Sequence, residues 1–304
     1  MIGPHTGGMR LGVLGVDSSH LPEFTRRIAG LNEAGATRCR VVSMFDAGDH
    51  QLPAADVAGW VAEAKAMGVQ ERGSVEELLG GVDGVLVLAV AGGRHLELAE
   101  PALQRGLPTY VDKPLACTAA DARRLAALAE EHAAPCYSAS SLRFAAEPVA
   151  AAADASLGDI VAVDAFGPGE LLDANPGVLH YGVHAVEMVD AVLGPGVAEV
   201  AAESTADRDL VRLRYADGRA ATLRLERRGS YDFGAAVHGT AGASFFKVDF
   251  ATVYDRLVEA MVGFFRGGQA PVPLSRIVEN VAVMEAANRS RETGGGWVKP
   301  DGAP

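Results

Sequence analysis

The feature that most constrains this sequence is a regular alternation, through its first half, of short apolar runs and longer stretches with helical periodicity. The apolar runs predict strands at 10–16, 40–45, 82–90, 109–112 and 135–138. Helices are expected between them, from near Pro22, over 54–67, after a cap at Ser74, over 94–105 and over 118–131. Strands that alternate with helices of this length favour right-handed βαβ crossovers and a mostly parallel sheet. We therefore expect an α/β domain over residues 1–150.

The second half has a different pattern. Apolar and polar residues alternate with period two, which predicts strands at 160–166, 197–204, 209–215, 220–227 and 235–238. The dipeptide Asp217-Gly218 favours a hairpin between two of these strands. Helices are expected over 180–193, 253–265 and 275–293. The pattern predicts an α+β domain with a mostly antiparallel sheet over residues 151–304.

Charge and cysteine content exclude several classes of function. The formal net charge is −12 and no basic stripe is present, which argues against nucleic acid as a partner. No apolar run approaches the roughly 20 residues that a membrane span requires. Residues 1–8 lack a signal-peptide pattern and are expected to form a short disordered leader. Three cysteines without a CxxC pair, Cys39, Cys117 and Cys136, indicate a reducing compartment, so we expect a cytoplasmic protein.

Several short motifs occur in one order along the chain. Val111-Asp112-Lys113-Pro114-Leu115 resembles the Glu-Lys-Pro motif of the Gfo/Idh/MocA oxidoreductases, with Asp in place of Glu. The segments 82–95, 142–144, 178–187 and 267–298 are similar to further motifs of that family, in the same order. The chain is thus identified as a divergent member, over residues 10–298. The resemblance implies an N-terminal Rossmann domain and a C-terminal domain for substrate binding and oligomerisation.

The resemblance also implies the catalytic residues. Lys113 matches a lysine that contacts the nicotinamide ribose and the substrate oxygen, where an ammonium stabilises a developing alkoxide. His184 matches a general base, and its ordinary pKa near 6.5 suits that work. His180 stands where the family has aspartate, and an imidazole there can relay a proton. On a helix, His180 and His184 share one face with Glu187. That trio could also hold a metal, or the histidines could be core residues bonded to backbone; we expect no metal.

The turn after the first strand departs from the usual dinucleotide pattern. Aligned on G-x-G-x-x-G, the chain reads Gly15-Val16-Asp17-Ser18-Ser19-His20, so only the first glycine remains. Asp17 either faces the cofactor phosphate and weakens binding, or turns away to cap the helix that begins near Pro22. His20 lies at the strand edge and is a candidate for a substrate contact.

Asp46 ends the second strand, where an acid binds the ribose hydroxyls of NAD and disfavours NADP. We therefore expect NAD as cofactor, with NADP less favoured. Cofactor contacts are expected at Gly15, Val16, Asp17, Ser18, Asp46, Ala91 and Lys113. Substrate contacts are expected at His20, His95, Arg143 and Tyr181.

Two functions remain open at this point. The first is an NAD(P)-dependent oxidoreductase that acts by hydride transfer on a sugar, a cyclitol or a similar polar secondary alcohol or its ketone. The second is a non-redox protein of the same fold, either a small-molecule binding or regulatory protein or an acid–base enzyme, and the altered glycine turn is its main support. We expect a small-molecule substrate and a homodimer or homotetramer formed through the C-terminal sheet.

Overall fold

The computed structural model describes residues 8–35 and 38–302. By contacts between Cα atoms, the chain divides into two compact units. The first comprises the chain up to Ala116 together with Asp121–Ser138 and Leu257–Leu274. The second comprises Cys117–Ala120, Ala139–Arg256 and the chain from Ser275 onward. The single boundary at residue 150 stays a prediction, and so does the leader, most of which lies outside the described residues.

The first unit is built on a six-stranded sheet in the order β3-β2-β1-β4-β5-β6. All neighbouring strands are parallel. The strands are β1 (Met9–Leu14), β2 (Cys39–Phe45), β3 (Gln70–Glu71), β4 (Gly84–Val87), β5 (Thr109–Val111) and β6 (Cys136–Tyr137). This order reverses direction between β1 and β4, the topological switch point at which open α/β sheets bind ligands. The predicted parallel-sheet domain is confirmed.

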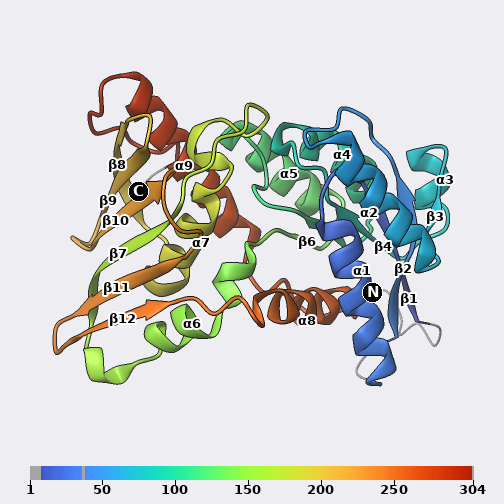
Figure 1. Ribbon diagram of the computed structural model, residues 1–304, viewed down its shortest axis with the longest axis horizontal. Coiled ribbons are helices and arrows are strands. Elements are labelled where there is room, and N and C mark those ends of the chain that lie inside the picture. The colour runs from blue at the N-terminus through green and yellow to red at the C-terminus, as the bar shows by residue number, and fades with distance from the viewer. Residues whose placement is uncertain (1–7, 36–37, 303–304) are drawn as a thin grey trace. The chain divides into compact units, whose positions relative to one another are not determined.

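Helices follow the strands of this sheet, as the blue to green part of the ribbon in Figure 1 shows. They are α1 (His20–Glu33), α2 (Ala54–Ala66), α3 (Val75–Leu79), α4 (His95–Gln104) and α5 (Ala119–Glu131). The predicted cap at Ser74 is confirmed, because its Oγ accepts the N–H of Glu77 at 3.1 Å. Helix α8 (Val253–Phe265) comes from a distant part of the sequence and completes the core of this unit. Its Phe264 ring packs edge-on against Tyr137, with ring centroids 4.8 Å apart.

The second unit holds a sheet in the order β12-β11-β7-β10-β9-β8. Its strands are β7 (Ile160–Pro168), β8 (Val197–Ser204), β9 (Arg208–Tyr215), β10 (Ala220–Glu226), β11 (Gly234–Gly239) and β12 (Ala243–Lys247). All pairs are antiparallel except β7 with β10. The hairpin at Asp217-Gly218 joins β9 to β10 as predicted, and Gly218 has a φ of 92°. The predicted mostly antiparallel sheet is therefore confirmed.

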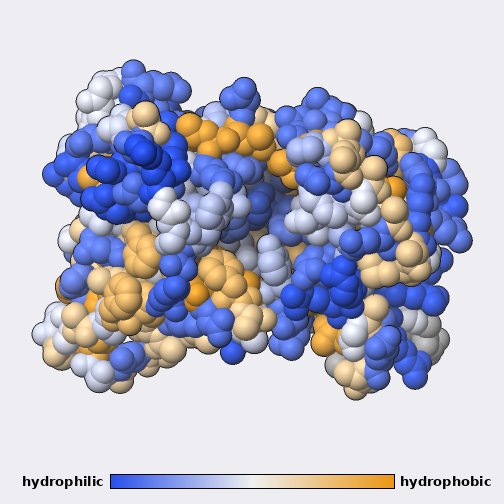
Figure 2. Space-filling model, viewed as in Figure 1, coloured by the Kyte–Doolittle hydropathy of each residue, from blue (hydrophilic) through white to orange (hydrophobic). Residues whose placement is uncertain are grey.

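Alternation along the strands gives this sheet one buried and one charged face. Val211, Leu213 and Tyr215 of β9 are buried, whereas Arg212 and Arg214 between them point outward. Figure 2 shows hydrophilic residues gathered over β8 and β9, and paler and apolar residues over β11 and β12. The other helices of this unit are α6 (Ala146–Ala152), α7 (Gly182–Leu193) and α9 (Leu274–Glu292). Among the described residues, no helix is both long enough and apolar enough to cross a membrane.

The start of α7 differs from the prediction. A helix was expected from 180, but α7 begins at Gly182, and His180 lies in the turn ahead of it. The physical reason lies in the backbone hydrogen bonds. The N–H of His184 donates to Tyr181 O at 3.2 Å, a bond that spans three residues. It therefore does not reach back to the carbonyl of His180. His180 thus lies ahead of the helix that carries His184, and the shared face of the two histidines stays a prediction. The short strands β3 and β12 were not expected from the sequence.

Candidate functional site

The turn between β1 and α1 keeps the one glycine that its geometry requires. Gly15 has a φ of +85°, and its N–H donates to Phe45 O at 3.0 Å. A Cβ at this position would lie 2.6 Å from the backbone nitrogen of Ala89. Glycine is therefore needed both for the backbone conformation and for the close approach of β1 to the segment after β4.

Asp17, at the position of the second glycine in the motif, is buried. Its Oδ2 accepts the N–H of Gln51 at 3.1 Å, and its Oδ1 accepts the N–H of Val90 at 3.1 Å. The N-cap residue of α1 is Ser19, with no side-chain cap bond. The alternative in which Asp17 caps that helix is therefore wrong, because its carboxylate is already bonded to two backbone amides elsewhere.

His20 begins α1 and is paired with Asp112, the residue that follows β5. Nδ1 of His20 lies 2.6 Å from Oδ2 of Asp112, and the Tyr110 hydroxyl donates to Oδ1 at 3.3 Å. Burial alone would raise the pKa of Asp112, but His20 and Lys113 outweigh it and hold the pKa well below its usual range. Asp112 is therefore a carboxylate at neutral pH.

Lys113 lies where the sequence predicted it, directly past β5 at the carboxyl edge of the sheet. Its side chain is half-buried, and the Lys113–Pro114 peptide bond is cis. The ionised Asp112 adjoins it in the chain, which places an anion beside an ammonium at the ligand-binding edge. Its predicted catalytic role remains a prediction.

His95 is fully buried, and its ring nitrogens face backbone carbonyls. Nε2 lies 2.7 Å from Ala89 O, and Nδ1 lies 2.9 Å from Pro114 O. Burial lowers the pKa of His95, so the neutral ring donates to one of these oxygens at a time. We propose that His95 ties the segment after β4 to the Lys113-Pro114 turn, in place of the predicted substrate contact.

The remaining predicted cofactor residues lie along the same edge. Asp46 follows β2, and its Oδ1 accepts the N–H of Gly48 and contacts Nε2 of His50, each at 2.8 Å. Val16 and Ser18 are buried in the β1–α1 turn, and Ala91 is the N-cap residue of the short helix η1 (Gly92–Arg94). NAD fits this edge at the Gly15 turn and at Asp46. The buried Asp17 and His20 stand at the other two glycine positions of the motif and depart from it.

In the second unit, His184 lies in the first turn of α7 and is held by Ser140. The Ser140 Oγ is 2.7 Å from Nδ1 of His184 and also accepts the N–H of Leu142 at 3.1 Å. The rings of Tyr181 and Phe233 each lie 5.6 Å from the His184 ring, centroid to centroid. The imidazole is therefore fixed on the Nδ1 side and bordered by aromatic rings.

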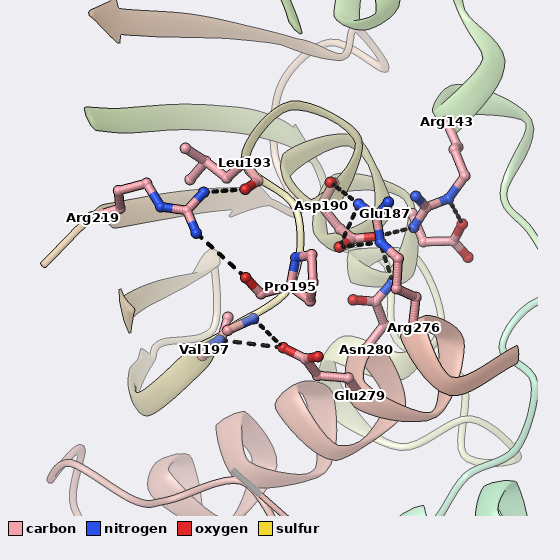
Figure 3. Close-up of polar contacts among 11 residues, drawn as sticks. Arg143, Glu187, Asp190, Leu193, Pro195, Val197, Arg219, Arg276, Glu279 and Asn280 are labelled. Atoms are coloured by element: carbon pink, nitrogen blue, oxygen red, sulfur yellow. Dashed lines mark hydrogen bonds and ion pairs between the residues drawn. The ribbon is translucent and has the colours of Figure 1, made fainter. Parts of the chain in front are cut away.

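Arg143 is only 6% exposed and belongs to a buried ion network rather than to an open surface (Figure 3). Its Nε donates to Glu187 at 2.8 Å, and its Nη2 donates to Asp190. Arg276 binds the other carboxylate oxygen of Asp190 at 3.0 Å, and Asn280 donates to Oδ2 at 3.4 Å. We propose that Arg143 positions α7, in place of the predicted substrate contact.

Glu187 connects this network to Ser140. Burial raises the pKa of Glu187, and the bonds from Arg143 and from the backbone N–H of Ser140 oppose that rise only in part. Ser140 is thus held by its backbone to Glu187 and by its hydroxyl to His184. No group of three or more His, Cys, Asp or Glu side chains in the described part of the chain is arranged to hold a metal ion.

Sequence reasoning missed Ser140, because a serine 44 positions from its histidine partner carries no local signal. It also missed Phe233, whose ring borders His184, and Tyr231, whose ring centroid lies 6.3 Å from that of Tyr181. Tyr231 comes from the segment between β10 and β11 and is 61% exposed.

The family comparison agrees with these features. Residues 9–140 match the model of the GFO_IDH_MocA oxidoreductase family, an NAD-binding Rossmann fold. The match covers the N-terminal residues of the chain, and over these residues the resemblance expected from the sequence is confirmed. The NAD-binding character of the family agrees with the predicted cofactor. A comparison with curated proteins finds no match.

Solved structures share the fold over nearly the whole chain. GenD2 from gentamicin A biosynthesis, in complex with NAD, is 20% identical, with a TM-score of 0.78 and 97% of each chain covered. The apo scyllo-inositol dehydrogenase from Lactobacillus casei is 12% identical, with a TM-score of 0.79 and coverage of 97% of this chain and 99% of that one. The WlbA dehydrogenase from Bordetella pertussis, in complex with NADH and UDP-GlcNAcA, is 17% identical, with a TM-score of 0.78 and coverage of 97% and 98%.

Proposed function

We propose that this protein is an NAD-dependent oxidoreductase acting on a sugar, a cyclitol or a similar polar secondary alcohol or its ketone. The observation that carries the proposal is Lys113, which follows β5 at the carboxyl edge of a sheet with the order β3-β2-β1-β4-β5-β6. The substrate class is supported by the solved structures of similar fold, which include a scyllo-inositol dehydrogenase and a dehydrogenase in complex with UDP-GlcNAcA.

Each residue has a defined part in this proposal. Bound NAD supplies the nicotinamide that accepts or returns the hydride. The Lys113 ammonium stabilises negative charge on the substrate oxygen. His184 takes the hydroxyl proton at Nε2, because Ser140 holds the Nδ1 side of the ring. His180, in the turn before α7, exchanges that proton onward. Asp46 binds ribose hydroxyls and favours NAD over NADP.

Two measurements test this proposal. Calorimetric titration of NAD⁺, NADH, NADP⁺ and NADPH should give binding of the non-phosphorylated pair in preference to the other. NADH consumption with a panel of cyclitol and sugar ketones should then be lost in Lys113→Ala and in His184→Ala. Lys65→Ala is the matched control, because that lysine is half exposed and paired with Glu71 on the surface. Full activity in His184→Ala would exclude His184 as the general base.

One observation favours a second candidate. The buried Asp17 carboxylate stands at a glycine position of the dinucleotide motif. A non-redox protein of this fold, either a binding or regulatory protein or an acid–base enzyme using His184 and Lys113, would tolerate that residue. Absence of NAD binding to folded protein would favour this second function.

We also propose a cytoplasmic homodimer or homotetramer that assembles through the C-terminal sheet. Support for the compartment comes from Cys39, Cys117 and Cys136, none of which is joined to another described cysteine in a disulfide. Support for the interface comes from the outer face of the C-terminal sheet, where alternate residues of β9 are at least partly exposed. Sedimentation over a range of protein concentrations tests the assembly, because a homo-oligomer dissociates on dilution.

A further inference from the structure

Asp17 lies at the carboxyl end of β1, in the middle of the parallel sheet. Strand β1 lies between β2 and β4, and Asp17 follows β1 in the chain. Its two carboxylate oxygens accept N–H groups from Gln51, after β2, and from Val90, after β4. A side chain bonded to the segments on both sides of β1 must lie across the carboxyl end of that strand. It therefore crosses the switch point between β1 and β4.

The dinucleotide of a Rossmann protein crosses the same edge, with its diphosphate at the turn that carries the glycine motif. In that motif the second glycine allows the backbone to approach the diphosphate. Here a buried anion stands at that position, 3% exposed and bonded to the protein on both oxygens. The carboxylate already accepts hydrogen bonds from two backbone N–H groups at the edge where an incoming anion would bind.

We propose that the Asp17 carboxylate is a built-in anion at the switch point that limits the affinity of this protein for the diphosphate of NAD. The inference rests on the proposed function, because it assumes that NAD is the ligand of this edge. It assigns Asp17 an effect opposite to that of a cofactor-binding residue. The sequence-based expectation of a favourable cofactor contact at Asp17 is replaced accordingly.

The size of the effect follows from Coulomb's law. Two like unit charges about 4 Å apart repel each other. In water this repulsion raises the Kd of a charged ligand roughly fivefold, and at an effective dielectric of about 20 it raises the Kd several hundredfold. Removal of the Asp17 charge should therefore tighten binding of NAD⁺ by at least about fivefold.

The test is calorimetric titration of NAD⁺, ADP-ribose and adenosine into the full chain and three variants. Asp17→Asn removes the charge and keeps the size of the side chain, although its amide oxygen can accept only one of the two backbone bonds in the same way. Asp17→Gly restores the residue of the motif. Asp49→Asn is the matched control, because Asp49 lies in the same loop as Gln51 and its side chain is 68% exposed. Thermal melting establishes that each variant is folded.

Both Asp17 variants should bind NAD⁺ and ADP-ribose at least about fivefold more tightly than the parent, with adenosine unchanged and with Asp49→Asn within about twofold. Binding of NAD⁺ by the variants alone would also support the inference, and it would overturn the proposed function of the parent chain. Equal affinity in parent and variants would overturn the inference and leave the proposed function standing. Weaker binding in either folded variant, or no binding in any protein, would overturn it as well.

Discussion

Ser140 Oγ lies 2.7 Å from Nδ1 of His184, and the same oxygen accepts the N–H of Leu142. We assign a proton to Nδ1 in this bond, because a serine oxygen has a second lone pair that can accept it. The bond then persists in both the neutral and the protonated imidazole. In the proposed reaction, Nε2 is then the nitrogen that exchanges its proton with substrate, as a general base requires.

Ser140→Ala should release the imidazole from this arrangement. The expected result is a loss of about tenfold in kcat, a part of the roughly 10²–10⁴ that general base catalysis contributes. Nitrogen-15 chemical shifts of the His184 ring should show a mixture of tautomers in the variant and one tautomer in the parent. Ser140→Thr, which keeps the hydroxyl, should restore the single tautomer. An unchanged tautomer and pH profile in Ser140→Ala would limit Ser140 to a structural role.

Arg143→Met should strongly destabilise the protein. It leaves the buried carboxylate of Glu187 without its cation and removes one of the two arginines that bind Asp190. The expected loss is about 3–5 kcal/mol in the free energy of unfolding, measured by urea denaturation. Arg228→Met serves as control, because its side chain is 80% exposed and its pair with Asp207 spans 3.5 Å. That control should change stability by about 0.5 kcal/mol or less. Equal effects of the two substitutions would contradict the role of the buried network.

Asp112→Asn should reduce the acid sensitivity of folding. The folded-state pKa of Asp112 is depressed below the ordinary value of 3.8, so the carboxylate contributes stability above that pH. This contribution is lost as the pH falls through 3.8 toward the folded-state value. The difference in unfolding free energy between parent and variant should therefore shrink from about pH 6 to about pH 3. A difference that stays constant or grows on acidification would be inconsistent with the ion pair.

Gly15→Ala should damage the β1–α1 turn. The φ of +85° and the distance of 2.6 Å from a Cβ to Ala89 N predict a loss of at least about 2 kcal/mol in stability. Gly59→Ala is the control, since that glycine lies within α2 and an added Cβ meets nothing within 4 Å. Because alanine has a higher helix propensity than glycine, Gly59→Ala should raise the free energy of unfolding by up to about 1 kcal/mol. Thermal unfolding of both variants would check the contrast.

The two sheets were predictable because hydrophobic period alone distinguishes buried parallel strands from half-exposed antiparallel ones. The alternation of Val211, Leu213 and Tyr215 with arginines identified β9, for example. The strand β3 escaped prediction because it has two residues, and two residues show no period. His180 was placed on a helix because the spacing of residues does not reveal where the first backbone bond forms.

The site was less predictable than the fold. Lys113 and the Gly15 turn followed from motifs, since chain direction and φ place them. The partners of Asp17 and Arg143 did not, because they come from segments 34 to 73 and 44 to 47 positions away. Such long-range pairs depend on the tertiary fold, and a charged residue in a motif does not reveal whether it faces a ligand or a buried counter-ion.

Helix α8 packs on the parallel sheet but is synthesised long after the strands of that sheet. An added Cβ at Gly84 of β4 would lie 2.7 Å from the ring of Phe265, and Tyr137 of β6 packs on Phe264. A ribosome therefore releases all six strands of that sheet well before it makes the phenylalanines that pack on β4 and β6. The nascent chain therefore carries these strands without their phenylalanine partners while all six strands of the second sheet are made.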